Sequence, residues 1–238
     1  MRRVTAVLAA SLSLTVCFWG SANAAPLNLN DVVEDESPEQ LCERVAADPF
    51  EGFGPEEWSH PFTRVDFYRA LPACTEALKA HPDEQRFALG VALANVAGKK
   101  QEAAKPLLED LIAKGNTSAM LVLAYISPES EAATLMKQAA DAGNPNAMML
   151  WGMTLITGKG VPKDTLEGVR LMRQAAEAGS TRAMLILANF YNQGVYGVGL
   201  NPREATSLIT EAAEKGDPAA KNVLANLQAA GEGGATPQ

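Results

Sequence analysis

A glycine followed by a helix-capping residue recurs four times in this chain and divides it into repeats. The glycines stand 28, 36 and 37 residues apart, and each is followed four positions later by an alanine. Glycine suits the left-handed position just past a helix end, and Asn, Ser and Asp cap the next helix well. A period of this length predicts an array of stacked helical units. The four phrases are Gly115-Asn116, Gly143-Asn144, Gly179-Ser180 and Gly216-Asp217.

Caps, breakers and apolar periodicity together predict an all-α chain, and no alternating pattern typical of strands occurs. Pro145 and Pro218 follow two of the caps, at the first helical position, where proline is well tolerated. We expect Pro72 to break or bend the helix that contains it. The predicted helices span residues 39–47, 65–80, 84–97, 101–114, 117–126, 129–142, 145–157, 165–178, 181–193, 202–215 and 218–229.

The repeats resemble the Sel1-like repeat, a relative of the tetratricopeptide repeat. In the unit 147–179, Trp151-Gly152 stand at the family's Leu-Gly pair, and Gly158-Lys159-Gly160-Val161 matches its Gly-x-Gly-Val loop. Ala175-Ala176-Glu177 then precede the closing glycine. The resemblance covers residues 85–228 and implies a right-handed α-solenoid of three to four helix-turn-helix repeats.

The units differ in the loop that joins their two helices. The unit after Gly179 carries short insertions between Gly194 and Asn201, whereas the unit 119–143 has lost eight residues around this loop. The stretch 88–115 is more divergent, and residues 220–227 form a half repeat expected to cap the solenoid.

The N-terminus has the features of a secretory signal peptide. Arg2 and Arg3 precede an apolar run from Val4 to Gly20, and Ala22-Asn23-Ala24 fits a cleavage site. A retained anchor helix and a lipoprotein are the alternatives, although the bulky Val16 before Cys17 disfavours lipidation. We therefore expect a periplasmic or secreted protein with no membrane span after cleavage.

Cleavage would remove two of the 20 basic residues and none of the 28 acidic ones, which leaves a formal charge of −10. This charge excludes nucleic acid and anionic membranes as favourable partners. Cys42 and Cys74 would remain, and an oxidising compartment favours a disulfide between them over two unpaired thiols. The predicted regions are a signal peptide (1–24), an acidic leader (25–37), a disulfide-stapled helical cap (38–84), the repeat solenoid (85–229) and a disordered tail (230–238).

No motif for catalysis, a cofactor or a metal stands out. His60 and His81 each precede a proline in an expected loop or turn, without neighbours that suggest a metal site or a proton relay. Gly158-Lys159-Gly160 lacks the spacing of a phosphate-binding loop and follows a helix instead of a strand. The sequence therefore predicts a protein that is not an enzyme and binds no cofactor.

Two surfaces are candidates for partner binding. Segment 50–68 holds half of the twelve aromatic residues that follow the signal peptide, including Trp58, and is either a stapled cap or an aromatic hook. The first helices of the repeats would line a concave face, whose exposed stripe lies between the small residue, the Leu-Gly pair and the Tyr position. Asparagines there suit an extended peptide, because an amide both donates and accepts. The candidate partner-binding residues on this stripe are Tyr125, Asn146, Met149, Met153, Arg182, Asn189, Asn192 and Asn222.

The family that these repeats resemble is known for adaptor and scaffold roles. The resemblance implies a non-catalytic scaffold, adaptor or regulator in the bacterial cell envelope that binds a protein or peptide on its concave face. An accessory module that binds an envelope glycan or another polymer is the alternative, and aromatic residues on the groove would favour it.

Overall fold

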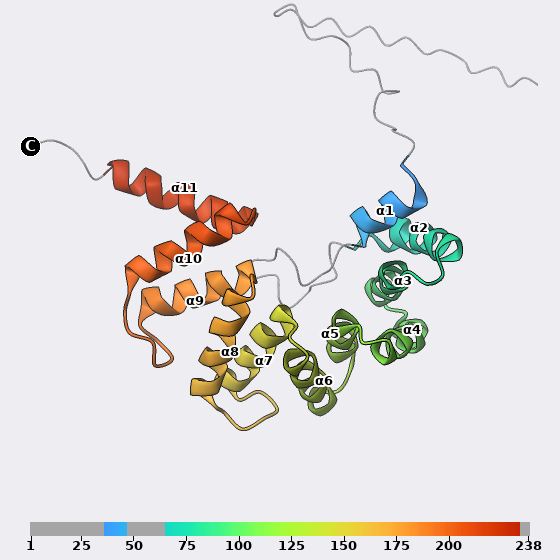
Figure 1. Cartoon of the computed structure of the whole chain (residues 1–238), viewed down its shortest axis with the longest axis horizontal. Coiled ribbons are helices and arrows are strands. Elements are labelled where there is room, and N and C mark those ends of the chain that lie inside the picture. Colours follow the sequence, from blue (N-terminus) through green and yellow to red (C-terminus); the bar gives the residue numbers. More distant parts are fainter. Residues whose placement is uncertain (1–35, 47–64, 234–238) are drawn as a thin grey trace, which may run out of the picture. The chain divides into compact units, whose positions relative to one another are not determined.

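The computed structural model describes residues 36–46 and 65–233, and within these ranges every regular element is an α-helix (Figure 1). The expected all-α repeat fold is thus confirmed. The signal peptide, nearly all of the leader and Trp58 lie outside the described residues. The helices are α1 (Pro38–Val45), α2 (Phe67–Ala80), α3 (Gln85–Ala97), α4 (Gln101–Ala113), α5 (Thr117–Ile126), α6 (Glu129–Asp141), α7 (Pro145–Thr157), α8 (Thr165–Glu177), α9 (Thr181–Gln193), α10 (Pro202–Glu214) and α11 (Pro218–Gly233).

The helix bounds agree with the predicted ones to within two residues, with one exception at the C-terminal end. Helix α11 continues to Gly233, four residues beyond the predicted end and into the region expected to be a disordered tail. Pro72, which was expected to break or bend its helix, does not break it, because α2 runs through this proline as a single helix.

Each repeated phrase forms the same junction between two helices. Gly115, Gly143, Gly179 and Gly216 all have positive φ angles, between 82° and 99°. At the first junction the Gly115 N–H donates to the carbonyl of Ile112 and the Asn116 N–H to that of Leu111. This pair of bonds is the Schellman motif, and it recurs at the other three junctions. The φ value explains the glycine, since a Cβ is costly there.

The alanine four positions after each repeated glycine donates its backbone N–H to the side chain of the capping residue. The side-chain oxygen of Asn144 accepts from the N–H of Ala147 at 2.9 Å, and the other caps accept from their own alanines at 2.9–3.3 Å. These alanines are completely buried, where a larger side chain would hold the helices apart. They are Ala119, Ala147, Ala183 and Ala220.

The caps also join neighbouring repeats. The Asn144 amide donates to the Thr117 hydroxyl at 2.9 Å, and the Thr181 hydroxyl donates to the Asp217 carboxylate at 2.7 Å. Each bond links the first residue of one repeat's first helix to the cap of the next repeat. Repeat stacking is thus fixed by polar contacts at the helix N-termini as well as by apolar packing.

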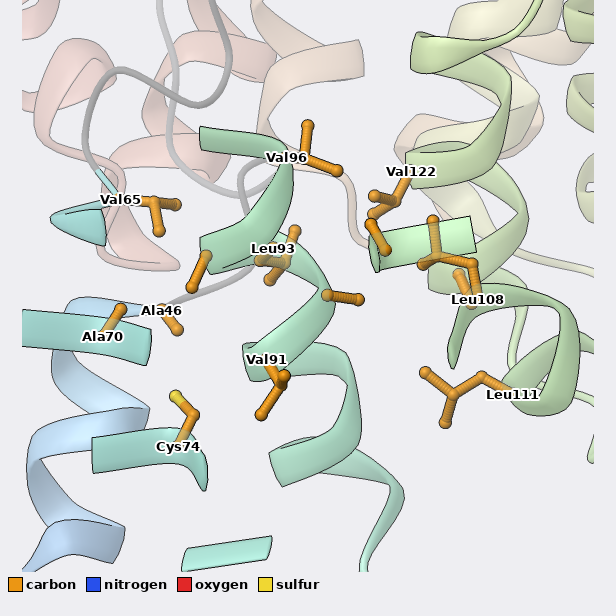
Figure 2. Packing of buried hydrophobic residues seen from close by; sticks show 14 of the residues in the cluster. Ala46, Val65, Ala70, Cys74, Val91, Leu93, Val96, Leu108, Leu111 and Val122 are labelled. Carbon is orange, nitrogen blue, oxygen red and sulfur yellow. The ribbon is translucent and has the colours of Figure 1, made fainter. Parts of the chain in front are cut away.

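Helices pack in chain order, so each one contacts its predecessor and its successor (Figure 1). The buried residues of α1 to α6 form one apolar cluster that reaches Ala147, and a second cluster continues from Met149 to Ala220. Figure 2 shows α3, with Val91 and Leu93, between Cys74 of α2 and Leu108 of α4. Such a core extends with every added repeat and has no single centre.

The structure contains the predicted Cys42–Cys74 disulfide, which joins α1 to α2. Gly90 of α3 packs directly against it, because a Cβ at this position would lie 2.8 Å from both sulfurs. Leu89-Gly90 correspond to the Leu-Gly pair of the resembling family. In this chain the glycine makes room on α3 for the disulfide that joins α1 to α2.

The same Leu-Gly position is used differently in the repeat 145–180. A Cβ on Gly152 would lie 2.7 Å from the carbonyl oxygen of Gly168, and a Cβ on Gly168 would lie 2.5 Å from that of Gly152. The backbones of α7 and α8 therefore touch at this crossing. In the neighbouring repeats the equivalent pairs are Ala124 with Ala132 and Ala188 with Ala205.

Candidate functional site

A groove of about 770 Å³ opens on α5, α6 and α7. Its apolar lining is contributed by Leu121 of α5, Met136 of α6, and Leu150 and Met153 of α7. The Thr154 hydroxyl lies 3.8 Å from the Met136 sulfur and links α7 to α6 across the lining. The groove is large enough for one or two side chains of a partner.

Charged residues stand around this apolar lining. Lys159, in the loop after α7, and Arg182 of α9 contribute two cations, and Glu129 at the start of α6 contributes one carboxylate. The Glu129 side chain packs against the next repeat's loop, because a Cβ on Gly160 would lie 2.7 Å from its Cγ. Arg182 is only 5% exposed, so its guanidinium is shielded from bulk water.

The groove lies where one repeat is shorter than the next. Helix α5 has 10 residues and is joined to α6 by Ser127-Pro128 alone, whereas α7 has 13 residues and a loop from Gly158 to Asp164. Tyr125, Ser127 and Glu129, on both sides of the short connection, all line the groove. The eight missing residues noted in the sequence thus coincide with an opening in the surface.

The longer loops each carry a valine that the short connection lacks. Val198, at the Gly-x-Gly-Val position of the last full repeat, is 5% exposed and belongs to the apolar core. Its equivalent Val161 is half-buried. Residues 127–128 include no valine, and the apolar residues of α5, α6 and α7 line a groove beside them.

Three of the predicted stripe residues meet in this groove. Tyr125 is 43% exposed at the end of α5, Met153 is half-buried on α7, and Arg182 reaches the groove from α9. They come from the first helices of three successive repeats, which we call the first-helix face (α5, α7, α9 and α11). The helical register thus selected residues that are up to 57 positions apart in the sequence and that line the same groove.

Met149 is a wrong prediction, because it is completely buried. It belongs to the same buried cluster as Met172 of α8 and Met184 of α9. The register counted residues along one helix and took Met149 to face solvent, but residues of other helices cluster around it. Arg182 is likewise buried and not exposed as expected.

The predicted asparagines lie elsewhere on the first-helix face. Asn146 is half-buried at the start of α7, and Asn189, Asn192 and Asn222 are exposed on α9 and α11. None of them lines the groove beside α5. The Asn189 side-chain oxygen accepts from Gln193 at 2.9 Å, which orients this amide on the surface.

A second groove, of about 820 Å³, was not predicted from the sequence. It lies between the first half of α8 and the connection from α9 to α10, and it is lined by Lys163, Arg170, Arg173 and Tyr196. Leu166 beside them is 84% exposed. The sequence features that could have indicated this groove are Arg170 and Arg173, three positions apart on α8, and Leu166 among polar residues.

Arg170 in the second groove is paired with Glu167, and its Nε donates to the carboxylate at 2.6 Å. This hydrogen bond, reinforced by the positive charge of Arg170, lowers the pKa of Glu167. Both groups thus stay ionised near neutral pH. Arg173 lies one helical turn away and is 3.4 Å from the Tyr191 hydroxyl.

The described residues contain neither a cluster of metal ligands nor a candidate membrane-spanning helix. Within them, no three His, Cys, Asp or Glu side chains gather as metal ligands would. None of the described helices combines the length and the apolar character that a bilayer crossing requires.

The fold and its junctions place the protein among α-helical repeat proteins, and comparison with known families specifies the repeat. Residues 119–144, 145–180 and 181–217 each match the family model described as Sel1 repeat. The chain thus carries three Sel1 repeats in tandem, and the resemblance expected from the sequence is confirmed over these residues. Proteins built from such repeats are interaction scaffolds, and the fold is generally non-catalytic.

Two solved structures are similar to the chain. A Sel1 repeat protein from Oxalobacter formigenes is 24% identical, with 47% of this chain and 90% of that one covered and a TM-score of 0.42. A protective antigen of uropathogenic Escherichia coli strains that displays an SLR fold is 19% identical, with a TM-score of 0.46. That match covers 81% of this chain and 49% of the antigen. No curated protein matches the chain.

Proposed function

We propose that this protein is a non-catalytic scaffold or adaptor of the bacterial cell envelope that binds a partner protein or peptide on its first-helix face. The observation that carries the proposal is the tandem of three Sel1 repeats, whose first helices present exposed polar residues and one apolar groove. Residues that serve the fold, such as the capping asparagines and buried alanines, are separate from this surface.

The envelope location is supported by two features. A disulfide joins Cys42 to Cys74, and such bonds form and persist in oxidising compartments such as the periplasm. The N-terminal sequence has the charge, apolar run and cleavage site of a secretory signal. We propose a periplasmic or secreted protein on this basis.

The polar part of the proposed surface consists of Asn189 and Asn192 of α9 and Asn222 of α11. These exposed amides are suited to the backbone of an extended segment, because each offers a donor and an acceptor. Substitution of two exposed amides is expected to leave the core intact, so their role in binding is separable from stability.

Affinity capture from a bacterial envelope extract tests the proposal. We expect the purified protein to retain a defined partner and the Asn189→Ala/Asn192→Ala double variant to retain at least tenfold less of it, with an unchanged melting temperature. The matched control is Gln138→Ala, an exposed amide on α6 outside the first-helix face. Capture of no protein by the wild type would contradict the scaffold function, and equal capture by both forms would remove the asparagines from the site.

A further inference from the structure

We propose that the second groove, between α8 and the connection from α9 to α10, binds an acidic segment of a partner protein. Carboxylates of this segment would lie against Lys163 and Arg173, and an apolar side chain next to them would contact Leu166 and Tyr196. This groove is formed by a second helix and a loop, outside the first-helix face. The site is therefore additional to the asparagines of the proposed scaffold and does not depend on their partner.

The lining of the groove is positively charged, although the chain is acidic. Three cations, Lys163, Arg170 and Arg173, stand against two carboxylates, Asp164 and Glu167. The formal charge of the lining is thus +1, whereas that of the whole chain is −8. A local charge opposite in sign to that of the molecule favours an acidic ligand at this place.

Both carboxylates of the groove already have partners within the protein. Glu167 accepts from the Arg170 guanidinium with both oxygens, so this pair contributes little net charge. Asp164 caps α8, where its side chain accepts from the Glu167 N–H at 3.0 Å. The positive end of the helix dipole offsets part of this negative charge. In the described part of the chain, neither carboxylate forms an ion pair with Lys163 or Arg173.

Lys163 and Arg173 are therefore the cations to which a ligand can bind. Both are exposed, and neither forms an ion pair with any other described residue. Arg173 donates to the Tyr191 hydroxyl at 3.4 Å, which leaves most of its five N–H groups available. A carboxylate matches the planar fork of a guanidinium. An acidic segment would thus be attracted to the groove, whereas a basic segment would be repelled.

Tyr196 stands at an insertion in its loop. Between the two glycines of this loop, the repeat 145–180 has only Lys159, whereas the repeat 181–217 has two residues, the second of which is Tyr196. Its φ of 57° lies in the left-handed region that a bulky side chain rarely adopts. The ring packs edge-on against Phe190, with 4.7 Å between the centroids, and is 42% exposed. Backbone conformations of this kind cluster at binding sites, so we assign the ring to the site.

The apolar surface beside the cations favours a protein segment over a polysaccharide. Leu166 is 84% exposed at the start of α8, and it lines the groove together with Tyr196. An apolar side chain of a partner would remove this surface from water, which is favourable. An acidic polysaccharide would also meet the cations, but it has no aliphatic side chain to cover Leu166.

Selection from a random dodecapeptide library displayed on phage, with the purified protein as bait, tests the proposal. We expect enriched peptides to contain Asp or Glu beside Leu, Ile, Val, Met or an aromatic residue. Arg173→Gln should weaken the binding of a labelled selected peptide at least tenfold, because it removes a guanidinium from the groove. Enrichment of no peptide, or of basic peptides, would overturn the proposal.

Two exposed lysines supply a matched control for the charge. Lys163→Gln should weaken the same peptide about fivefold, because Lys163 lines the groove. Lys221→Gln removes the same charge from α11, outside the groove, and should leave the affinity unchanged. Equal effects of the two variants would reduce the contribution of charge to long-range attraction and overturn the assignment of the carboxylates to this groove.

The Tyr196 ring can be removed without strain in the backbone of its loop. Tyr196→Gly places at this positive φ a residue that adopts it readily. The variant should bind the selected peptide at least fivefold more weakly, because the apolar contact is lost. Unchanged affinity would overturn the apolar part of the proposal.

Methyl NMR locates the peptide without relying on a variant. With ¹³C-labelled leucine methyls, the bound peptide should shift the signal of Leu166 and leave that of Leu227, which is exposed on α11, in place. A shift of Leu227 without one of Leu166 would overturn the site. A shift of Leu166 by polygalacturonate, when no peptide is enriched, would assign the groove to an acidic polysaccharide and overturn the protein partner.

The scaffold function and the second groove fail separately. The Asn189→Ala/Asn192→Ala variant should bind the selected peptide as the wild type does, because neither asparagine lines this groove. Loss of the peptide in this variant would place it on the first-helix face and overturn the groove. Capture of no envelope protein, together with a peptide that binds the groove as described, would support the groove and contradict the envelope scaffold.

Discussion

The repeat 119–144 and the repeat 145–180 are built from the same junctions but present different surfaces. Both begin with an asparagine cap that accepts from a buried alanine N–H, and both close on a glycine with positive φ. The first is shorter by eight residues, because its first helix has 10 residues instead of 13 and its connection is residues 127–128 instead of 158–164. The shorter repeat borders a groove. Stacking in this protein is thus set by the ends of the repeats and surface shape by their middles.

The difference extends to the helix crossing inside each repeat. In the longer repeat Gly152 and Gly168 bring two backbones into contact, whereas Ala124 and Ala132 stand at these positions in the shorter one and line the groove. A close crossing leaves no room for a ligand. The comparison shows two backbones in contact inside one repeat and an apolar groove that borders the other.

The largest expected effect comes from the same substitution at equivalent positions of the two repeats. Gly168→Leu should lower the free energy of unfolding by about 3 kcal/mol, because even its Cβ would collide with the α7 backbone. Ala132 is 8% exposed and borders the groove, so Ala132→Leu should cost less, about 1 kcal/mol. Urea unfolding of both variants measures the difference, and equal losses would show that the crossings are alike.

The loop valine should show the next largest effect. Val198→Ala removes buried methyl groups and should lower the free energy of unfolding by about 2 kcal/mol. Met153→Ala, at the half-buried groove lining, should lower it by about 1 kcal/mol or less. Thermal or urea unfolding compares the two. A larger loss for Met153→Ala would mean that the groove lining acts as core, against the distinction drawn between the repeats.

Substitution of a cap residue by alanine should lower the free energy of unfolding by about 1–2 kcal/mol, with the larger loss where the cap makes more hydrogen bonds. Asn144→Ala removes a cap bond and the bond to Thr117, and should cost more than Ser180→Ala, which removes one cap bond. Asn144→Asp is the control, because a carboxylate accepts both bonds as Asp217 does. If Ser180→Ala cost as much as Asn144→Ala, the link between repeats would contribute nothing measurable.

The smallest effect is expected at Glu167, which belongs to the longer repeat only. Arg170 lowers the pKa of this carboxyl in the folded protein, so the pair stabilises the fold above the pKa of the unfolded chain. Its contribution is lost as the pH falls through the lowered, folded-state pKa. Because the pair is exposed to solvent, Glu167→Gln should cost less than about 0.5 kcal/mol at pH 7. Unfolding of both forms from pH 7 to pH 3 should show the difference vanish, and a constant difference would contradict the ion pair.

The sequence by itself determined the helices and the repeat register, because caps, glycines and prolines act on their immediate neighbours. Gly143, Asn144 and Ala147 predicted a junction that the structure reproduces bond by bond. The same local pattern identified Tyr125, Met153 and Arg182, which the fold brings to one groove. The disulfide partners followed from the compartment and from the two cysteines that remain after the signal peptide.

The tertiary structure decided which residues of each helix stay accessible. Met149 and Met153 lie one helical turn apart, yet the first is completely buried in the core and the second lines the groove. A helical period gives the direction of a side chain from its own axis, but burial depends on how closely the next repeat approaches. Inside a repeat, the approach of the two helices is likewise set by contacts such as Gly152 with Gly168, which lie on different helices and which no local pattern encodes.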